Sequence, residues 1–454
     1  MSRRPYRRPG RQQQRPAARF QARVLPEPLA IERLSHDGRG IARWEGKTLF
    51  VAGALPGETV TVRLLGEQSR FAEGEVTEVL VPAAQRQTPP CRHYGTCGGC
   101  QLQHLAPRSQ VAAKQQAVLD QLERQGKVRP KELVPAILSP SEGYRHRARL
   151  GVWTEKNGTV TLGFRRKRER TLTPIDACEV LAPALNALLA PLRGWLEGLE
   201  RRDAVGHIEL ILSEEGPAMV VRELKALSPR DLQRLGTVGD GALGDRIWRQ
   251  TTSEGLSDLN GEPCDPRLHY GLPDFELDLA FHPQDFTQVN VEVNRAMVRQ
   301  AVDWLAPQPG ERVLDLFCGM GNFTLPLARS GAWVRGLEGS DAMVGRAREN
   351  ARRHGLEAEF DTANLARGDA RLWPKGTPLD AVLLDPPRDG ARELMAPLAQ
   401  LRPRRLVYAS CNPATLARDA GELATAGYDL QSLGVLDMFP HTEHVESMAL
   451  FVRR

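Results

Sequence analysis

Apolar runs with the length of a buried strand recur through the last third of the chain, each followed by turn residues. They occupy residues 313–316, 333–337, 381–384 and 406–410. Runs of this length bounded by turn signals are typical of strands in a parallel sheet. The first is followed by a glycine-containing turn and a helical pattern at 325–329. We therefore predict a Rossmann-like α/β domain over residues 281–454.

A different pattern covers residues 25–85, where short strands are separated by glycine and proline turns. The predicted strands lie at 31–34, 47–51, 59–64 and 74–79. Such spacing is typical of a small closed all-β barrel of the OB-like kind, and these barrels commonly bind single-stranded nucleic acid. The pattern alone does not exclude a barrel that docks another protein.

The region between them, residues 86–280, is predicted to be an α+β domain with two basic stretches. Residues 144–150 alternate as a strand with one cationic face, and residues 164–168 form a basic run. Charge runs are usually solvated faces. Because Tyr144 and Phe164 flank these two, a track for RNA phosphates and stacked bases is the alternative hypothesis.

Positive charge is concentrated at the N-terminus. The net charge is +5, and residues 1–23 hold eight arginines and no acid, so the remainder carries −3. We predict a disordered basic tail over residues 1–24. Its simplest role is to aid solubility, but arginines that contact phosphates suit an RNA partner better.

The sequence contains no run of about 18 apolar residues, the length that a membrane span needs. No hydrophobic segment follows the N-terminal charges, so no secretory signal is expected. We expect a cytoplasmic protein. There the seven cysteines are expected to be reduced or metal-bound rather than paired in disulfides.

The turn after the first predicted strand favours a nucleoside ligand without phosphates. Gly319 and Gly321 would let the backbone close on a ligand. A dinucleotide-binding turn needs a third glycine for the pyrophosphate, and Phe323 and Thr324 stand in its place. The turn therefore favours S-adenosylmethionine over NAD. Glu338 ends the next strand, at the spacing from which a carboxylate binds ribose hydroxyls, although a solvated glutamate is the alternative.

Cys411 ends the last apolar run, immediately before Asn412 and Pro413. The carboxyl ends of strands line the ligand crevice of an open α/β sheet, so this thiol is a candidate nucleophile. Most free cysteines are instead small core residues. The preceding strand ends in Asp385, within a motif that closes at Arg388, and so brings further polar groups to the same edge.

Three cysteines, Cys91, Cys97 and Cys100, lie within ten residues of a turn-rich segment. Two glycines between them let the chain fold back, so that all three thiols can reach one metal centre. No fourth ligand is present locally, and Cys178 is the nearest remaining cysteine. Ligation by four thiolates suits zinc as well as an iron–sulfur cluster.

Four motifs in this chain closely resemble those of the bacterial RNA uracil-C5 methyltransferases. They lie at residues 315–323, 385–388, 410–413 and 444–446. The likeness extends from about residue 25 to residue 454 and is greatest for the branch that methylates uracil 1939 of 23S ribosomal RNA. Members of that branch carry an N-terminal TRAM domain and an iron–sulfur cluster.

The resemblance implies a role for each candidate site residue. Cys411 would be the nucleophile that adds to carbon 6 of uracil, and Glu446, two residues after His444, the general base that removes the proton from carbon 5. Arg388 would stabilise the enolate oxygen. The implied cofactor-binding residues, of which Gln288 and Asp385 are also possible uracil contacts, are Gln288, Phe317, Asn322, Glu338, Asn364 and Asp385.

The same resemblance implies the cofactors and partners. The cofactor would be S-adenosylmethionine, and a [4Fe-4S] cluster would be held by Cys91, Cys97, Cys100 and Cys178. The barrel would be an RNA-binding TRAM domain. The substrate would be 23S ribosomal RNA, methylated by a monomeric enzyme.

Two other classes of protein remain as alternatives. Enzymes that methylate exocyclic amines share an Asp-Pro-Pro motif, but they stack the base on an aromatic residue where this chain has Arg388, and they need no Cys411. A non-catalytic RNA-binding iron–sulfur protein that keeps the fold is the other, since fold alone does not establish activity.

Overall fold

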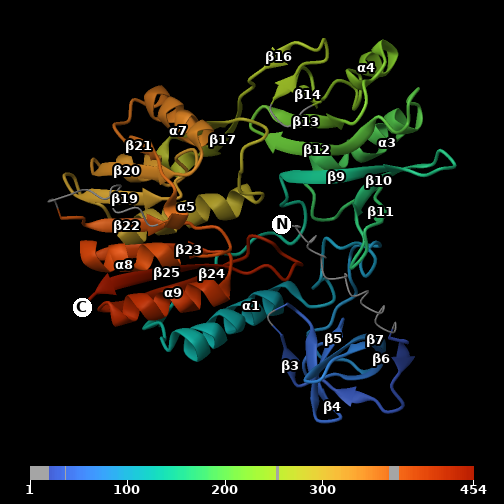
Figure 1. Cartoon of the computed structure of the whole chain (residues 1–454), viewed down its shortest axis with the longest axis horizontal. Coiled ribbons are helices and arrows are strands. Elements are labelled where there is room, and N and C mark those ends of the chain that lie inside the picture. Colours follow the sequence, from blue (N-terminus) through green and yellow to red (C-terminus); the bar gives the residue numbers. More distant parts are fainter. Residues whose placement is uncertain (1–19, 36, 252–254, 368–377) are drawn as a thin grey trace, which may run out of the picture. The chain divides into compact units, whose positions relative to one another are not determined.

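A computed structural model describes residues 20–35, 37–251, 255–367 and 378–454 (Figure 1). Its contacts divide the chain into two compact units, Met1–Ala84 and Gln85–Arg454. The predicted basic tail lies largely outside the described residues, which begin at residue 20. Within the described ranges, no helix is both long and apolar enough to cross a membrane.

The first unit is a single curled sheet with strand order β1-β6-β7-β5-β4-β3, in which β2 also pairs with β6. Its strands are β1 (Arg23–Val24), β2 (Leu29–Ala30), β3 (Arg33–Leu34), β4 (Gly40–Trp44), β5 (Lys47–Ala52), β6 (Thr59–Glu67) and β7 (Phe71–Val81). Leu25 beside β1 and Ala42 in β4 share one buried core with Val62 of β6. Side chains from both ends of the strand order thus meet, which requires the sheet to wrap around its core.

The second unit contains a central sheet with strand order β11-β10-β9-β12-β13-β14-β15-β16. Its strands are β9 (Arg147–Thr154), β10 (Val160–Arg165), β11 (Leu172–Pro174), β12 (Val205–Ser213), β13 (Gly216–Glu223), β14 (Ile247–Gln250), β15 (Leu256–Ser257) and β16 (Pro263–Cys264). The helices in this region are α2 (Pro183–Asn186), α3 (Leu189–Glu197) and α4 (Pro229–Leu235). Leu192 and Trp195 of α3 pack with Leu150 of β9 in its core. A hairpin of β17 (Leu268–Leu272) and β18 (Leu277–Phe281) follows, with the short helix η2 (Pro273–Phe275) at its turn.

The same unit contains the predicted α/β sheet, with strand order β21-β20-β19-β22-β23-β25-β24-β8. Its strands are β19 (Arg312–Leu316), β20 (Trp333–Glu338), β21 (Glu359–Thr362), β22 (Ala381–Leu384), β23 (Arg405–Ser410), β24 (Tyr428–Leu436), β25 (Glu446–Arg453) and β8 (Glu132–Leu133). The five strands from β21 to β23 are parallel, and β25 runs antiparallel to both of its neighbours. The strand order reverses at β19, which places a ligand crevice at the carboxyl ends of β19 and β22.

Helices cover both faces of this sheet, as Figure 1 shows. The helices are α1 (Pro107–Gln121), η1 (Leu122–Gly126), α5 (Val291–Leu305), α6 (Thr324–Ala328), α7 (Asp341–Arg353), η3 (Leu365–Arg367), α8 (Arg392–Leu401) and α9 (Pro413–Thr425). Val313 of β19 packs with α5, α6 and α7, whereas its neighbour Leu314 packs with α1, α8 and α9. Because successive strand side chains point to opposite faces, this split accounts for the continuous apolar runs in the sequence. The predicted α/β fold class is confirmed.

Residues 107–133 pack on the α/β sheet, although they lie in the predicted central region of the sequence. Helices α1 and η1 contact α9, and β8 extends the sheet beside β24. Gly126 of η1 meets α9 so closely that a Cβ atom there would stand 2.4 Å from the carbonyl oxygen of Ala417. The segment that follows Cys100 is therefore packed directly on the α/β sheet and its helices.

Candidate active site

One large cavity in the Gln85–Arg454 unit brings most of the candidate residues together. Its volume is about 1080 Å³. This exceeds the roughly 300–1,000 Å³ of a pocket for one small molecule, so a cofactor and a nucleotide can meet in it. The candidate residues that line it are Cys91, Cys97, Cys100, Cys178, Gln288, Phe317, Glu338, Asp385, Arg388, Cys411, His444 and Glu446.

Cys411 and Glu446 lie beside each other at the ends of two paired strands. Cys411 follows Ser410, the last residue of β23, and Ser410 pairs with Ser447 of β25. Glu446 precedes Ser447, so the antiparallel register sets the thiol beside the carboxylate. Two residues that are far apart in the sequence are thus positioned by backbone pairing alone, which is more rigid than a loop.

Hydrogen bonds tie the loops of the other two motifs to this pair. The Asn412 side chain caps α9 through the Ala414 N–H and also donates to the Arg388 carbonyl oxygen at 3.0 Å. The Arg388 guanidinium lies 3.1 Å from Nδ1 of His444. Three of the four motifs, at residues 385–388, 410–413 and 444–446, therefore converge at one edge of the sheet.

Burial controls the protonation of this group. Burial raises the pKa of Cys411 to about 11, the carboxylates of Glu446 and Asp385 act in the same direction, and Arg388 opposes them. Burial also raises the pKa of Glu446 to about 8 and that of Asp385 to about 6. At neutral pH the thiol of the free protein therefore keeps its proton, and Glu446 is largely neutral.

The glycine turn and Glu338 also line the cavity. The Glu338 carboxylate accepts from the Gly319 N–H at 3.2 Å and from the Ser340 N–H at 3.1 Å. These bonds leave acceptor capacity on both oxygens for two hydroxyl groups of a ligand. Phe317 begins the turn with a φ of +67°, a conformation that non-glycine residues seldom adopt and that is often found at binding sites.

Gln288 is carried by the loop between β18 and α5. Arg147 holds this loop by donating to the carbonyl oxygens of Pro283 and Asp285, each at 2.5 Å, and also pairs with Glu209 at 2.7 Å. This arginine belongs to the predicted cationic strand, and its guanidinium is engaged inside the protein rather than solvated.

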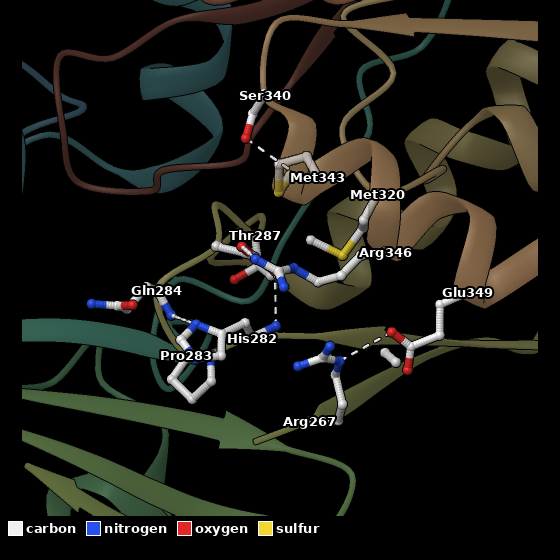
Figure 2. Close-up of polar contacts among 12 residues, drawn as sticks. Arg267, His282, Pro283, Gln284, Thr287, Met320, Ser340, Met343, Arg346 and Glu349 are labelled. Carbon is white, nitrogen blue, oxygen red and sulfur yellow. Dashed lines mark hydrogen bonds and ion pairs between the residues drawn. The ribbon is translucent and has the colours of Figure 1, made fainter. Parts of the chain in front are cut away.

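The start of the same loop lies against α7 (Figure 2). There the Gln284 N–H donates to Nδ1 of His282 at 3.2 Å, and Arg267 donates to Glu349 of α7 at 3.2 Å. Figure 2 also shows Ser340, whose hydroxyl accepts from the Met343 N–H at the start of α7. Both Ser340 and Met343 line the cavity.

Two residues implied as cofactor contacts do not line the cavity. The Asn322 side chain exchanges two hydrogen bonds with Asn294 of α5, at 3.0 and 3.1 Å, and accepts another from the Tyr270 hydroxyl at 2.9 Å. It ties the glycine turn to neighbouring elements. Asn364 is exposed, just after β21.

The four candidate metal-binding cysteines also line the cavity and lie near one another. The thiolates of Cys91, Cys97 and Cys178 each add to the burial that raises the pKa of Cys100 to about 12, so the four sulfur atoms are close enough for their charges to interact. In the described part of the chain, no three His, Cys, Asp or Glu side chains stand close enough to hold one metal ion.

Two residues in or near the site, the cavity residue Phe286 and the buried Lys114, were not found from the sequence. Phe286 lies on the Gln288 loop with 71% of its surface exposed, and its place beside that motif was the available signal. Lys114 lies on α1, 3% exposed, and its positive charge acts on Glu446. Nothing in the helical pattern of residues 107–121 distinguishes this lysine from a surface one.

Family models match three parts of the chain. Residues 27–77 match the TRAM domain, residues 313–385 a methyltransferase domain, and residues 373–454 the tRNA (Uracil-5-)-methyltransferase family. The strand order, the glycine turn with Glu338 and these matches together define the class: the second unit has the fold of an α/β methyltransferase.

Close relatives identify the family. A 23S rRNA (uracil(1939)-C(5))-methyltransferase RlmD from Alkalilimnicola ehrlichii is 48% identical, over 94% of this chain and 97% of its own length. Its counterpart from Nitrosospira multiformis is 45% identical, over 94% and 98%. The chain belongs to this family of 23S rRNA (uracil-C5)-methyltransferases. The crystal structure of the Pyrococcus abyssi tRNA (uracil-54, C5)-methyltransferase in complex with S-adenosyl-L-homocysteine is similar, with a TM-score of 0.69 and 25% identity over 94% of this chain and 100% of that one.

Proposed function

We propose that this protein transfers the methyl group of S-adenosylmethionine to carbon 5 of one uridine in 23S ribosomal RNA, the position that its relatives' names give as uracil 1939. The observation that carries the proposal is that Cys411 and Glu446 flank the paired residues Ser410 of β23 and Ser447 of β25, in a cavity shared with the glycine turn. A thiol and a carboxylate in this arrangement are the two groups that methylation at carbon 5 requires.

Carbon 5 of uracil is too weak a nucleophile to take a methyl group unaided. In our proposal, the Cys411 thiol first loses its proton to solvent. The thiolate sulfur then bonds to carbon 6, and the ring becomes an enolate whose carbon 5 attacks the methyl carbon. The bond from that carbon to the cofactor sulfur breaks, leaving S-adenosylhomocysteine. Arg388 lies at this edge of the cavity and stabilises the developing enolate oxygen.

Glu446 completes the reaction. After transfer, carbon 5 carries both the methyl group and its original proton, and Glu446 accepts that proton. The electrons of the broken C–H bond restore the double bond between carbons 5 and 6 and expel the Cys411 thiolate. Glu446 must be ionised to act, and its pKa of about 8 makes this role sensitive to the charges around it.

The cofactor is proposed to bind between the glycine turn and α7. Glu338 would accept hydrogen bonds from the ribose hydroxyls, since the Gly319 and Ser340 N–H groups already orient its carboxylate. Phe317, Gln288 and Asp385 would line the rest of the site. Asn322 would act indirectly, by holding the turn. The sulfonium supplies the methyl group and brings a positive charge into the cavity.

The RNA is proposed to enter as an unstacked nucleotide. A uracil inside a duplex cannot present carbon 6 to a thiol, so a loop or flipped base is required. Arg145 and Arg149 line the cavity and can contact phosphates there. The TRAM barrel would add RNA affinity. We further propose that the enzyme works as a cytoplasmic monomer.

Cys91, Cys97, Cys100 and Cys178 are proposed to hold a [4Fe-4S] cluster. The support is that all four thiols line one cavity and lie close enough for their charges to interact. When present, the cluster would join segments that are distant in the sequence.

RNA containing 5-fluorouridine at the target position tests the proposal. Fluorine cannot leave carbon 5 as a proton does, so a carbon-6 thiol mechanism stalls as a covalent complex. We expect the wild type with S-adenosylmethionine to form a denaturation-resistant complex, and Cys411→Ala to form none while still binding the cofactor. Methylation of an exocyclic amine without a complex would support the amino-methyltransferase alternative, and RNA binding without any methylation the non-catalytic one.

A further inference from the structure

One segment, residues 101–114, holds the loop that leads into Glu446. The Gln101 and Leu102 N–H groups both donate to the His441 carbonyl oxygen at 2.9 Å. The Gln110 side chain accepts from the His441 N–H at 2.7 Å, and its nitrogen lies 3.0 Å from Nδ1 of the same histidine. His441 has a φ of +67°, so these bonds maintain a backbone conformation that a side chain disfavours.

Lys114 holds the beginning of the same loop. Its Nζ donates to Oδ1 of Asp437 at 3.0 Å and to the Phe439 carbonyl oxygen at 2.9 Å, and the side chains of Lys114 and Asp437 are only 3% and 4% exposed. Asp437 follows Leu436, the residue of β24 that pairs with Glu446. Asp437 of the ion pair is therefore one residue beyond the residue of β24 that pairs with Glu446.

A buried ion pair is costly to form, because both charges lose their hydration. An apolar pair of similar size would often give equal or greater stability. A role in stability alone is therefore a weak explanation for an ion pair that bonds the loop at two points beside the proposed base.

We propose that Lys114 is a positioning residue for Glu446: it directs the path of the loop after β24 so that the carboxylate at the start of β25 reaches carbon 5 of the uracil bound to Cys411. This inference rests on the proposed function, because it takes Glu446 as the base. Gln110 and the N–H groups of residues 101 and 102 complete the same clamp.

The charges around Glu446 give this role a measurable signature. Burial and Asp385 raise its pKa, whereas Arg388 and Lys114 lower it, and the Cys411 thiol lies next to it. Removing the Lys114 charge should raise the pKa of Glu446 further. Because the base acts in its ionised form, the acidic limb of the pH profile should move to higher pH.

The test compares Lys114→Met and the double variant K114M/D437N with the wild type in the full chain. The double variant leaves no unpaired carboxylate in the interior, so it tests positioning even if the single variant fails to fold. We expect turnover to fall about 10²-fold, as an ångström-scale misplacement costs. A covalent enzyme–RNA species already carrying the methyl group should accumulate, with S-adenosylmethionine affinity unchanged and the acidic limb shifted upward.

Lys131→Met is the matched control. Lys131 pairs with Asp429 at 2.8 Å. The Lys131 side chain is 57% exposed, and Asp429 lies at the start of β24, far from the end of that strand that pairs with Glu446. It should leave turnover and the pH profile unchanged. A folded K114M/D437N enzyme with wild-type turnover, pH profile and adduct level would overturn the inference. If Glu446→Gln itself accumulates no adduct, the assignment of the base in the proposed function is what fails.

Discussion

At the scale of single residues, the site combines a nucleophile and a base that are both largely protonated in the free protein at neutral pH. Burial and two carboxylates keep the Cys411 thiol protonated, with a pKa of about 11. Arg388 is the neighbouring cation that lowers it. A bound sulfonium would add positive charge to the same cavity and lower the pKa of Cys411 further. Cofactor binding can therefore prepare the thiol for attack.

This predicts how Cys411 reacts with an alkylating agent. Without ligand, the rate of iodoacetamide labelling should be slow at pH 7 and rise continuously towards pH 10, because only the thiolate reacts. Saturation with S-adenosylmethionine should move the rise to lower pH. S-adenosylhomocysteine, which lacks the positive charge, is the control for simple shielding of the thiol. Peptide mass spectrometry of the Cys411 site measures both, and equal shifts with the two ligands would contradict the prediction.

Glu446→Gln should separate methyl transfer from proton removal. The amide keeps the shape of the side chain but cannot accept the proton, and bond formation at carbon 5 precedes that step. We expect turnover to fall by about 10²–10⁴-fold, the usual contribution of a general base. With ordinary uracil RNA, a methylated covalent complex should appear on denaturing gels. Its absence, in a variant that still binds RNA and cofactor, would show that another group removes the proton.

At the scale of elements, the sequence predicted the strands of the catalytic sheet well and the use of some polar residues poorly. The runs at 313–316 and 406–410 lie within β19 and β23, because apolar side chains on both faces make such strands visible locally. Arg147 shows the limit. The alternating pattern of its strand indicated an outward cationic face. The Arg147 side chain instead hydrogen-bonds to a loop 136 residues away, and no local pattern in the sequence shows that contact.

Arg147→Met should therefore loosen the loop that carries Gln288. Hydrogen bonds from a charged donor contribute roughly 1.5–3 kcal/mol each, so we expect the free energy of unfolding to fall by about 2–4 kcal/mol and cofactor affinity to weaken. Arg149→Met is the control, since Arg149 is exposed on the same strand. It should change the free energy of unfolding by less than about 0.5 kcal/mol and lower only RNA affinity. Chemical denaturation and calorimetric binding would measure both, and identical behaviour of the two variants would contradict this role for Arg147.

At the scale of the whole molecule, the second unit is held together by contacts between distant parts of the sequence. Lys114 and Asp437 are 323 residues apart, and Gln110 reaches His441 across 331. Sequence motifs identify residues that act on a substrate, because the chemistry restricts the type and spacing of those residues. These contacts have no local pattern in the sequence, since they depend on the fold bringing α1 beside β24.

The cysteine group offers a test at this scale. Cys178 follows a long excursion of chain after Cys91, and closing such a loop through a cluster would stabilise the fold mainly by restricting the unfolded chain. We expect the wild type, purified without oxygen, to contain about four irons per chain. Cys178→Ser should lose most of that iron, unfold at lower temperature and become more sensitive to proteases.

Cys264→Ser is the matched control, because Cys264 is also partly buried but lies outside the group. It should keep its iron and its stability. Stoichiometric zinc without iron in the wild type would replace the cluster by a zinc site, and iron retained in Cys178→Ser would remove that cysteine from the ligand set, in each case without affecting the assignment of Cys411 and Glu446.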